Sequence, residues 1–301
     1  MSMTLSHDEL WPRAGSWPAA VAGQSADAAI LGIPTWRTSL SPTGAHATPA
    51  AIRDALARYS ATLMGPPIVD LNEVLRIVDA GDVEEPDGED GTERVVQRVR
   101  ALAARTGLVV ALGGDNSLTY PVARGAGADG LITLDAHFDL RDGVSNGSPV
   151  RRLVQDAPEV ERIDPTRIVQ IGIADFANSA AYAWRAADWG IRVISLDEVR
   201  EKGIRAVVAE ALAIAGAGSR IHLDVDVDVV DRSMAPGCPA SVPGGLAAGE
   251  LRALVRAIAA DSRVVSADIA EVDATADADD ARTVRLAALC VLELLAGLAS
   301  R

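Results

Sequence analysis

The chain has 301 residues, of which 49% are hydrophobic, and a formal net charge of -14 at pH 7. This hydrophobic content is enough for a large buried core, and the excess of acids argues against a nucleic-acid partner, which requires clustered Lys and Arg. No apolar run approaches the roughly 20 residues of a membrane span, and the N-terminus lacks the apolar segment of a secretion signal, so we expect a cytoplasmic protein without a membrane partner.

After a polar N-terminal arm (residues 1–25), short β-branched runs alternate with longer Ala/Leu/Arg stretches at helical spacing. This alternation is typical of repeated βα units. It predicts the α/β class: a mostly parallel sheet of about eight strands between two layers of helices, in a single domain over residues 1–301. The predicted strands are Ala28–Ile33, Val74–Val78, Leu108–Leu112, Gly130–Leu134, Ile168–Ile173, Ile191–Ser195, Arg220–Val225 and Arg263–Ile269.

Two segments have the composition of surface loops. Glu84–Gly91 is acidic and contains Gly, and Asp226–Gly249 is rich in Pro and Gly. Regular patterning resumes on both sides of each segment, so we expect loops rather than linkers between domains.

Polar clusters stand where predicted strands end. They are Gly113–Ser117, Asp135–Asp139, Asp224–Asp228 and Asp268–Glu271. Ligands of an open parallel sheet bind at the carboxyl edge of its strands. We therefore expect the four clusters to meet there and form one site.

The second cluster contains two carboxylates and an imidazole at alternate positions, Asp135, His137 and Asp139. Residues two apart in an extended segment project to the same side, and Asp224 and Asp226 repeat this spacing after another strand. So many acids in a small volume repel one another unless cations hold them ionised. Oxygen-rich ligation with one imidazole favours manganese over structural zinc.

A simpler interpretation is that these acids cap helices and form turns at βα junctions, where Asp is common. A lone Asp favours that interpretation. The combined density of DAHFD and HLDVDVD favours a metal site, in which Asp135 and Asp224 bridge two ions as in other two-metal hydrolases.

The clusters resemble the signature motifs of the ureohydrolase (arginase/agmatinase) family. The usual forms of these motifs are GGDHS, DAHxD, a strand ending SxDxDxxDP and a late acidic motif ending in Glu; here they read GGDNS, DAHFD, HLDVDVDVVDR and DIAEVD. The segments Leu31–Arg53 and Ile77–Val83 also resemble the family, so the resemblance covers nearly the whole chain. It implies an arginase-like fold, two Mn²⁺ ions per chain, a small-molecule substrate and a homo-oligomer, either a trimer or a hexamer.

Carried over residue by residue, the resemblance also implies roles. Asp139 is implied to hold the bridging hydroxide, and Glu271 to face the cationic carbon–nitrogen group of the substrate. We further expect Asp139 to handle the proton. Asn116 replaces the His of GGDHS with a neutral amide. It either ligates one metal more weakly than imidazole does, leaves that position to a water, or marks the loss of that metal. The implied metal ligands are Asn116, Asp135, His137, Asp139, Asp224 and Asp226.

The loop after DAHFD departs from family members that act on arginine or agmatine, because it lacks their His. It resembles the formimidoylglutamase branch, whose substrate carries two carboxylates. Guanidinium groups suit carboxylates, and Arg141 is better placed than Arg151 and Arg152, which equally fit a solvated helix start. Asn146 and Ser148 of the same loop are further candidate substrate-binding residues.

The expected activity is manganese-dependent hydrolysis of N-formimidoyl-L-glutamate to L-glutamate and formamide. One alternative is an amidinohydrolase that releases urea and uses the same ligands. Another is a catalytically silent family member acting as a regulatory or structural subunit, a possibility that Asn116 and the missing loop His raise. The retained acids argue against a catalytically silent protein, because burying carboxylates that bind no metal lowers stability.

Overall fold

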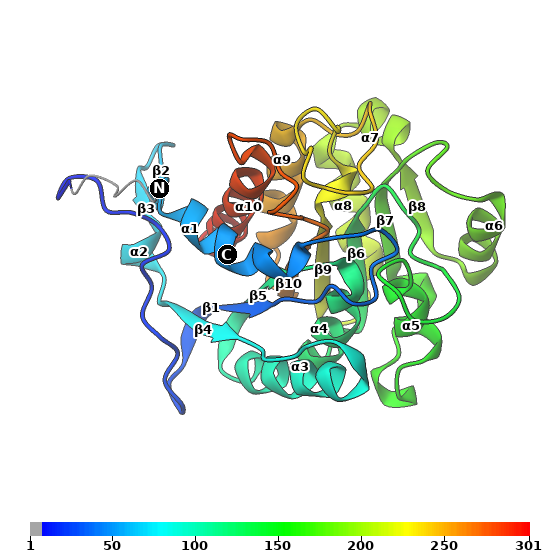
Figure 1. Ribbon diagram of the computed structural model, residues 1–301, viewed down its shortest axis with the longest axis horizontal. Helices are drawn as coiled ribbons and strands as arrows, with labels where there is room; N and C mark the ends of the chain where they lie inside the picture. Colours follow the sequence, from blue (N-terminus) through cyan, green and yellow to red (C-terminus); the bar gives the residue numbers. More distant parts are fainter. Residues whose placement is uncertain (1–7) are drawn as a thin grey trace.

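The computed structural model describes residues 8–301, so the first seven residues of the expected N-terminal arm lie outside it (Figure 1). Within the described residues, eight strands form one sheet in the order β4-β1-β5-β10-β9-β6-β7-β8, and every neighbouring pair is parallel. The strands are β1 (Ala26–Ile33), β4 (Ile77–Asp82), β5 (Thr106–Gly113), β6 (Gly130–Leu134), β7 (Ile168–Ile173), β8 (Arg192–Ser195), β9 (Ile221–Asp226) and β10 (Val264–Ala270).

Helices cover both faces of the sheet, which confirms the predicted three-layer α/β fold (Figure 1). One layer consists of α1 (Thr48–Leu56), α7 (Leu196–Lys202), α8 (Ile204–Ala215), α9 (Ala248–Ala259) and α10 (Arg282–Leu298). The other consists of α3 (Gly88–Ala103), α4 (Thr119–Ala126), α5 (Pro149–Gln155) and α6 (Ala180–Trp189). The six inner strands are buried on both faces, as their continuous apolar runs predict, whereas the edge strands β4 and β8 are only partly buried.

The second predicted strand is displaced along the chain. Asp70 accepts a hydrogen bond from the Asn72 backbone N–H (2.9 Å) and so caps the short helix α2 (Leu71–Val74). Strand β4 therefore begins only at Ile77. The two-residue strands β2 (Thr62–Leu63) and β3 (Val69–Asp70) pair in a small antiparallel sheet, and they are too short to leave a sequence pattern.

The prediction of a loop over Glu84–Gly91 is wrong at its C-terminal end, because α3 begins at Gly88. Glu89 and Asp90 belong to the first turn of that helix. Acids are favourable there because the helix dipole places partial positive charge at the N-terminus. The acidic composition thus marks a helix start.

Among the described helices, none is both long and apolar enough to cross a membrane.

The sheet order brings the polar clusters together. Strands β10, β9 and β6 are adjacent, with β5 beside β10, and their carboxyl ends share one edge because all four are parallel. The segments that follow these ends are the four motifs identified in the sequence.

Candidate metal centre and substrate pocket

Two groups of potential metal ligands lie at the carboxyl edge of the sheet within residues 8–301. One consists of Asp135, His137 and Asp228, and the other of Asp135, Asp139 and Asp226. Within each group the ligand atoms lie within 4.8 Å of one another. Asp135 belongs to both groups, so the two candidate groups lie side by side and share one carboxylate.

Two residues of the site have backbone conformations that side chains other than Gly rarely adopt. The φ angle is 52° at Asp139 and 59° at Glu271, in the left-handed region. Neighbouring segments hold both: the carbonyl of Asp139 accepts from Arg151 N–H (3.2 Å), and Glu271 N–H donates to the carbonyl of Gly114 (3.0 Å). Such strain persists only where the surrounding structure enforces it, and it is common at functional sites.

His137 is held between two carboxylates. Its Nδ1 lies 2.8 Å from Asp228 Oδ2 and 3.5 Å from Asp135 Oδ1. Burial opposes protonation of the ring, but the charges of Asp228 and Asp135 outweigh it and raise the pKa of His137 to about 12 in the metal-free protein. The imidazolium thus occupies the role that a divalent cation would otherwise have.

Burial and mutual repulsion raise the pKa of the other acids. Burial, followed by the charge of Asp228, raises the pKa of Asp135 to about 7. Burial, followed by the charge of Asp115, raises the pKa of Glu271 to about 8. The pKa values of Asp139 and Asp226 rise for the same two reasons, burial first. Divalent cations would hold these groups ionised.

The donor set fits manganese. Asp135 Oδ2 is fully buried and accepts no hydrogen bond from any described residue, although buried carboxylate oxygens are normally paired. Carboxylates with one imidazole are ligands that suit Mn²⁺. Without an ion, this oxygen has no favourable contact that would offset its desolvation.

The pKa shifts predict how the metal-free protein responds to pH. Asp135 and Glu271 have ordinary pKa values of 3.8 and 4.5, which rise to about 7 and about 8 on folding. Between the ordinary and the raised pKa of each group, the folded state therefore binds more protons than the unfolded state. The free energy of unfolding therefore falls as pH rises through this window. His137 acts in the same direction above its ordinary pKa of 6.5.

We accordingly expect the melting temperature of metal-free protein to fall by several degrees between about pH 5 and about pH 8, while Mn²⁺ restores it most strongly at the higher pH. Thermal melts with and without Mn²⁺ measure this, and calorimetry checks that metal binding releases protons. A metal-free melting temperature that rises over the interval is incompatible with these shifts.

Asp224, a predicted ligand, belongs to neither of the two groups found among the described residues. Its strand register places it between Asp268 of β10 and Thr133 of β6. Burial, followed by the charge of Asp268, raises its pKa well above the ordinary value. The structure puts Asp228 at the site instead.

The motif itself contains the signal that identifies Asp228. In SxDxDxxDP the first two Asp precede the last by five and three positions, and the last corresponds to Asp231. Counting back from Asp231 selects Asp226 and Asp228 and puts Asp224 at the Ser of the motif. Asp224 and Asp226, the ligands expected from the sequence, stand two positions earlier than this alignment of the motif.

Asn116 lies beside the second group, but its amide already has partners. Its Nδ2 donates to Asp139 Oδ2 (2.7 Å), and its Oδ1 accepts from Thr119 Oγ1 (2.6 Å). Ligation through Oδ1 requires the amide to turn toward the metal. In the present arrangement Asn116 orients the Asp139 carboxylate.

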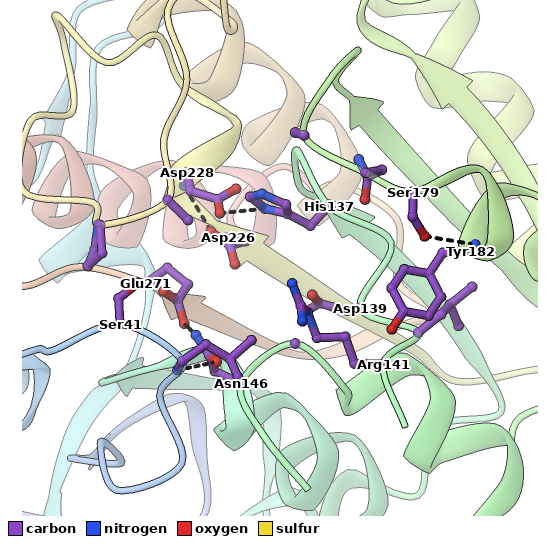
Figure 2. Close-up of a pocket in the computed structure, with 17 residues that line it drawn as sticks. Ser41, His137, Asp139, Arg141, Asn146, Ser179, Tyr182, Asp226, Asp228 and Glu271 are labelled. Carbon is purple, nitrogen blue, oxygen red and sulfur yellow. Dashed lines mark hydrogen bonds and ion pairs between the residues drawn. The ribbon is translucent and has the colours of Figure 1, made fainter. Parts of the chain in front are cut away.

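A pocket of about 230 Å³ opens above the ligand groups (Figure 2). Asp139, Asp226, Asp228 and Glu271 contribute acidic groups to its lining, and His137 lies among them. Figure 2 shows Arg141, Ser179 and Tyr182 on the side away from Glu271. The pocket therefore has an anionic end and an end rich in hydrogen-bond donors.

Glu271 is held in place by two amide groups. Its Oε1 accepts from Asn116 N–H (2.8 Å) and from Asn146 Nδ2 (2.7 Å). Asn146 Oδ1 in turn accepts from Leu40 N–H (3.0 Å). The predicted substrate-binding Asn146 therefore lines the pocket and also connects Glu271 to the loop at Leu40.

Ser148 is not brought to the pocket. Its hydroxyl donates to the carbonyl of Ser145 (2.8 Å) and accepts from Ser145 N–H (2.9 Å). The side chain is fully buried in this turn. Ser148 shapes the loop that carries Asn146 and is not positioned to contact a ligand.

Comparison with known proteins agrees with the fold and the motifs. The Arginase family model matches residues 26–297. The chain is 36% identical over 284 residues to a formimidoylglutamase of Bacillus subtilis, covering 90% of this chain and 86% of that protein. It is 33% identical over 238 residues to a guanidinopropionase of Pseudomonas aeruginosa, covering 75% and 73% of the two chains.

Solved structures are similar as well. The crystal structure of the Bacillus subtilis formimidoylglutamase superposes with a TM-score of 0.89 at 31% identity, covering 99% of this chain and 95% of that one. A Trypanosoma cruzi formiminoglutamase, solved with Mn²⁺, has a TM-score of 0.85 at 27% identity and covers 96% of this chain and 99% of its own. The motifs, the fold and these matches together identify the chain as a member of the arginase family, that is, as a hydrolase of amidine C–N bonds.

Proposed function

We propose that this protein is a manganese-dependent hydrolase that converts N-formimidoyl-L-glutamate to L-glutamate and formamide. The observation that carries the proposal is the lining of the pocket, which combines acidic side chains with the Arg141 guanidinium, and Arg141 lies on the side away from Glu271 (Figure 2). An amidinium with an acidic tail matches both ends. Similarity to formimidoylglutamases over most of the chain supports the same substrate.

The proposed centre contains two Mn²⁺ ions, held by Asp135, His137 and Asp228 and by Asp135, Asp139 and Asp226. Bound there, the metals would lower the pKa of a water molecule and polarise the carbon under attack. Asn116 would leave the second group with a weaker donor than the usual imidazole.

The side chains around the centre have distinct proposed roles. Glu271 accepts hydrogen bonds from the amidinium and stabilises its positive charge, because Asn116 and Asn146 both donate to its Oε1 and hold the carboxylate at the pocket. Asp139, oriented through Oδ2 by Asn116, takes the proton from the attacking water and delivers it to the departing nitrogen.

Three arginines of the loop were candidates for binding a substrate carboxylate, and two of them have other contacts. Arg151 donates to the carbonyls of Arg141 and Gly143 (both 2.7 Å) and pairs with Asp156. Arg152 stacks on the Tyr120 ring, with its guanidinium carbon 3.8 Å from the ring centroid. Arg141 lines the pocket, and this supports its assignment as the carboxylate-binding residue.

Replacing Arg141 with Gln is expected to raise the KM for N-formimidoyl-L-glutamate by about 10- to 100-fold, because a charge-assisted hydrogen bond to the substrate is lost. The kcat should change much less, since the metal groups and Glu271 are untouched. Steady-state kinetics measure the split. Arg205→Gln, on the exposed face of α8, is the charge-matched control, and an equal effect there would refute the assignment.

The main rival is an amidinohydrolase acting on a guanidino acid, as the similarity to a guanidinopropionase suggests. Product analysis distinguishes the two with Mn²⁺-loaded protein and three substrates: N-formimidoyl-L-glutamate, 3-guanidinopropionate and agmatine. Glutamate and formamide support the proposal, whereas urea from a guanidino substrate favours the rival. No turnover by protein with full metal content favours the silent family member.

The proposal also includes a cytoplasmic homo-oligomer, a trimer or a hexamer. Light scattering on the purified protein tests the assembly directly.

A further inference from the structure

The end of the pocket away from Glu271 includes the start of helix α6. Ser179 is the N-cap of this helix, and its Oγ accepts from Tyr182 N–H (3.4 Å). The hydroxyl proton of Ser179 therefore remains free to donate. The Tyr182 hydroxyl makes no hydrogen bond with any residue in the described part of the chain, and both side chains line the same cavity as Arg141.

The start of α6 is fixed relative to the metal ligands. Asn178 accepts from Phe138 N–H (3.0 Å) and donates to the carbonyls of Ala136 (2.8 Å) and Ala174 (3.3 Å). Phe138 and Ala136 alternate with the ligands of the DAHFD motif. The distance between the α6 hydroxyls and the metal centre is therefore determined by direct contacts, which favours recognition of a substrate of one length.

A second contact holds Tyr182 itself. The guanidinium carbon of Arg185 lies 5.6 Å from the centroid of the Tyr182 ring, and Arg185 donates to the carbonyl of Leu140 (2.7 Å). Arg185 also pairs with Asp142 (2.8 Å). This pair offsets the charge of the exposed Asp142, so Asp142 opposes an approaching carboxylate only weakly.

The pocket therefore offers three kinds of group: acids that can bind a cation, the Arg141 guanidinium, and the hydroxyls of Ser179 and Tyr182. We propose that Ser179 and Tyr182 bind the second carboxylate of a dicarboxylate amidine while Arg141 binds the first. The inference rests on the proposed function and adds a basis for choosing dicarboxylates over monocarboxylates.

Neutral donors suit the second carboxylate for an electrostatic reason. The substrate carries one amidinium charge and two carboxylate charges, and the amidinium is matched by Glu271 and its neighbours. Arg141 compensates one carboxylate, and the other needs hydrogen-bond donors because desolvating it without partners is costly. Hydrogen bonds to charged groups are strong enough for each hydroxyl to contribute about tenfold in binding.

The test compares three amidine substrates with Mn²⁺-loaded protein. N-formimidoyl-L-glutamate has both carboxylates, N-formimidoyl-4-aminobutyrate lacks the carboxylate next to the nitrogen, and N-formimidoyl-2-aminobutyrate lacks the distal one. We expect Tyr182→Phe and Ser179→Ala each to lower kcat/KM for the dicarboxylate about tenfold, mainly through KM. For the monocarboxylate that lacks the group bound at α6, kcat/KM should stay within about twofold of its starting value.

Two further measurements distinguish a loss of carboxylate binding from damage to the metal centre. Glutarate, a dicarboxylate without an amidine, should inhibit the variants about tenfold less strongly than the unaltered protein. Metal content checks that the centre is intact, and Tyr59→Phe, outside the pocket lining, is the matched control.

Equal losses for all three substrates would overturn the inference and leave the proposed function standing. No glutamate from the unaltered, fully metal-loaded protein would instead overturn the proposed function and the inference with it.

Discussion

Asp228→Asn is expected to lower manganese-dependent activity by more than about 100-fold, because partners that only support metal ligands already have effects of 10- to 100-fold. Asp228 belongs to the first ligand group and lies 2.8 Å from His137. Its loss removes a carboxylate from the ion and the partner that orients the imidazole. Metal content should fall below two Mn²⁺ per chain, as measured by elemental analysis alongside kinetics.

Asp224→Ser is the matched comparison within the same motif. Neither carboxylate oxygen of Asp224 accepts a hydrogen bond from a described residue, and the side chain is fully buried. Removing it deletes a buried group without a partner, so the melting temperature should stay the same or rise. Activity should remain within about tenfold. If Asp224→Ser abolished metal binding while Asp228→Asn did not, the assignment of ligands would have to be reversed.

Glu271→Gln is expected to lower kcat/KM by about 100- to 1,000-fold, the range found when one group that stabilises transition-state charge is removed. Gln keeps the size of the side chain and an oxygen that accepts from Asn116 N–H and Asn146 Nδ2. It loses the negative charge that faces the amidinium. Kinetics on protein of verified metal content measure the effect.

Asn146→Ala is the control that separates charge from position. It leaves the Glu271 charge in place and removes the hydrogen bonds that join Glu271 and the Leu40 backbone. We expect a smaller loss, about tenfold, mostly in kcat. An Asn146→Ala variant as impaired as Glu271→Gln would mean that the position of Glu271, more than its charge, is what matters.

Much of the fold was predictable because it depends on local pattern. The inner strands of the central sheet carry runs of β-branched and apolar residues, and their burial between two layers of helices follows from those runs. The start of α3 was missed because the acids of Glu84–Gly91 are typical of both a loop and a first helical turn. Composition alone does not distinguish these two contexts.

The site was predictable where one motif carries several ligands, as in Asp135, His137 and Asp139. Alternation alone was insufficient in the second motif, since Asp224, Asp226 and Asp228 are all spaced by two. The deciding feature is the end of the strand: β9 stops at Asp226, which caps a 3-10 turn over Val227–Val229 and directs Asp228 toward His137. Asp224 lies two residues before the end of β9 and stays within the sheet.

The loop contacts were less predictable because they join distant segments. Asn146 and Leu40 are 106 residues apart, and Asn146 and Glu271 are 125 apart. The sequence shows an Asn and a Ser in one turn with equal capacity for hydrogen bonds. Only the folded backbone directs Asn146 toward the pocket and Ser148 back into the turn.

The position of β10 in the sheet has a consequence for biosynthesis. Strands β5 and β9 are not neighbours, and β10 lies between them although it is the last strand of the sheet to be synthesised. The candidate ligands at the ends of β6 and β9 can meet on the ribosome before β10 emerges, but Glu271 follows β10 and arrives only when that strand inserts. Insertion of a central strand is a non-local step, and such steps are slow. A nascent chain should therefore acquire its metal-binding acids well before it acquires the carboxylate that faces the substrate.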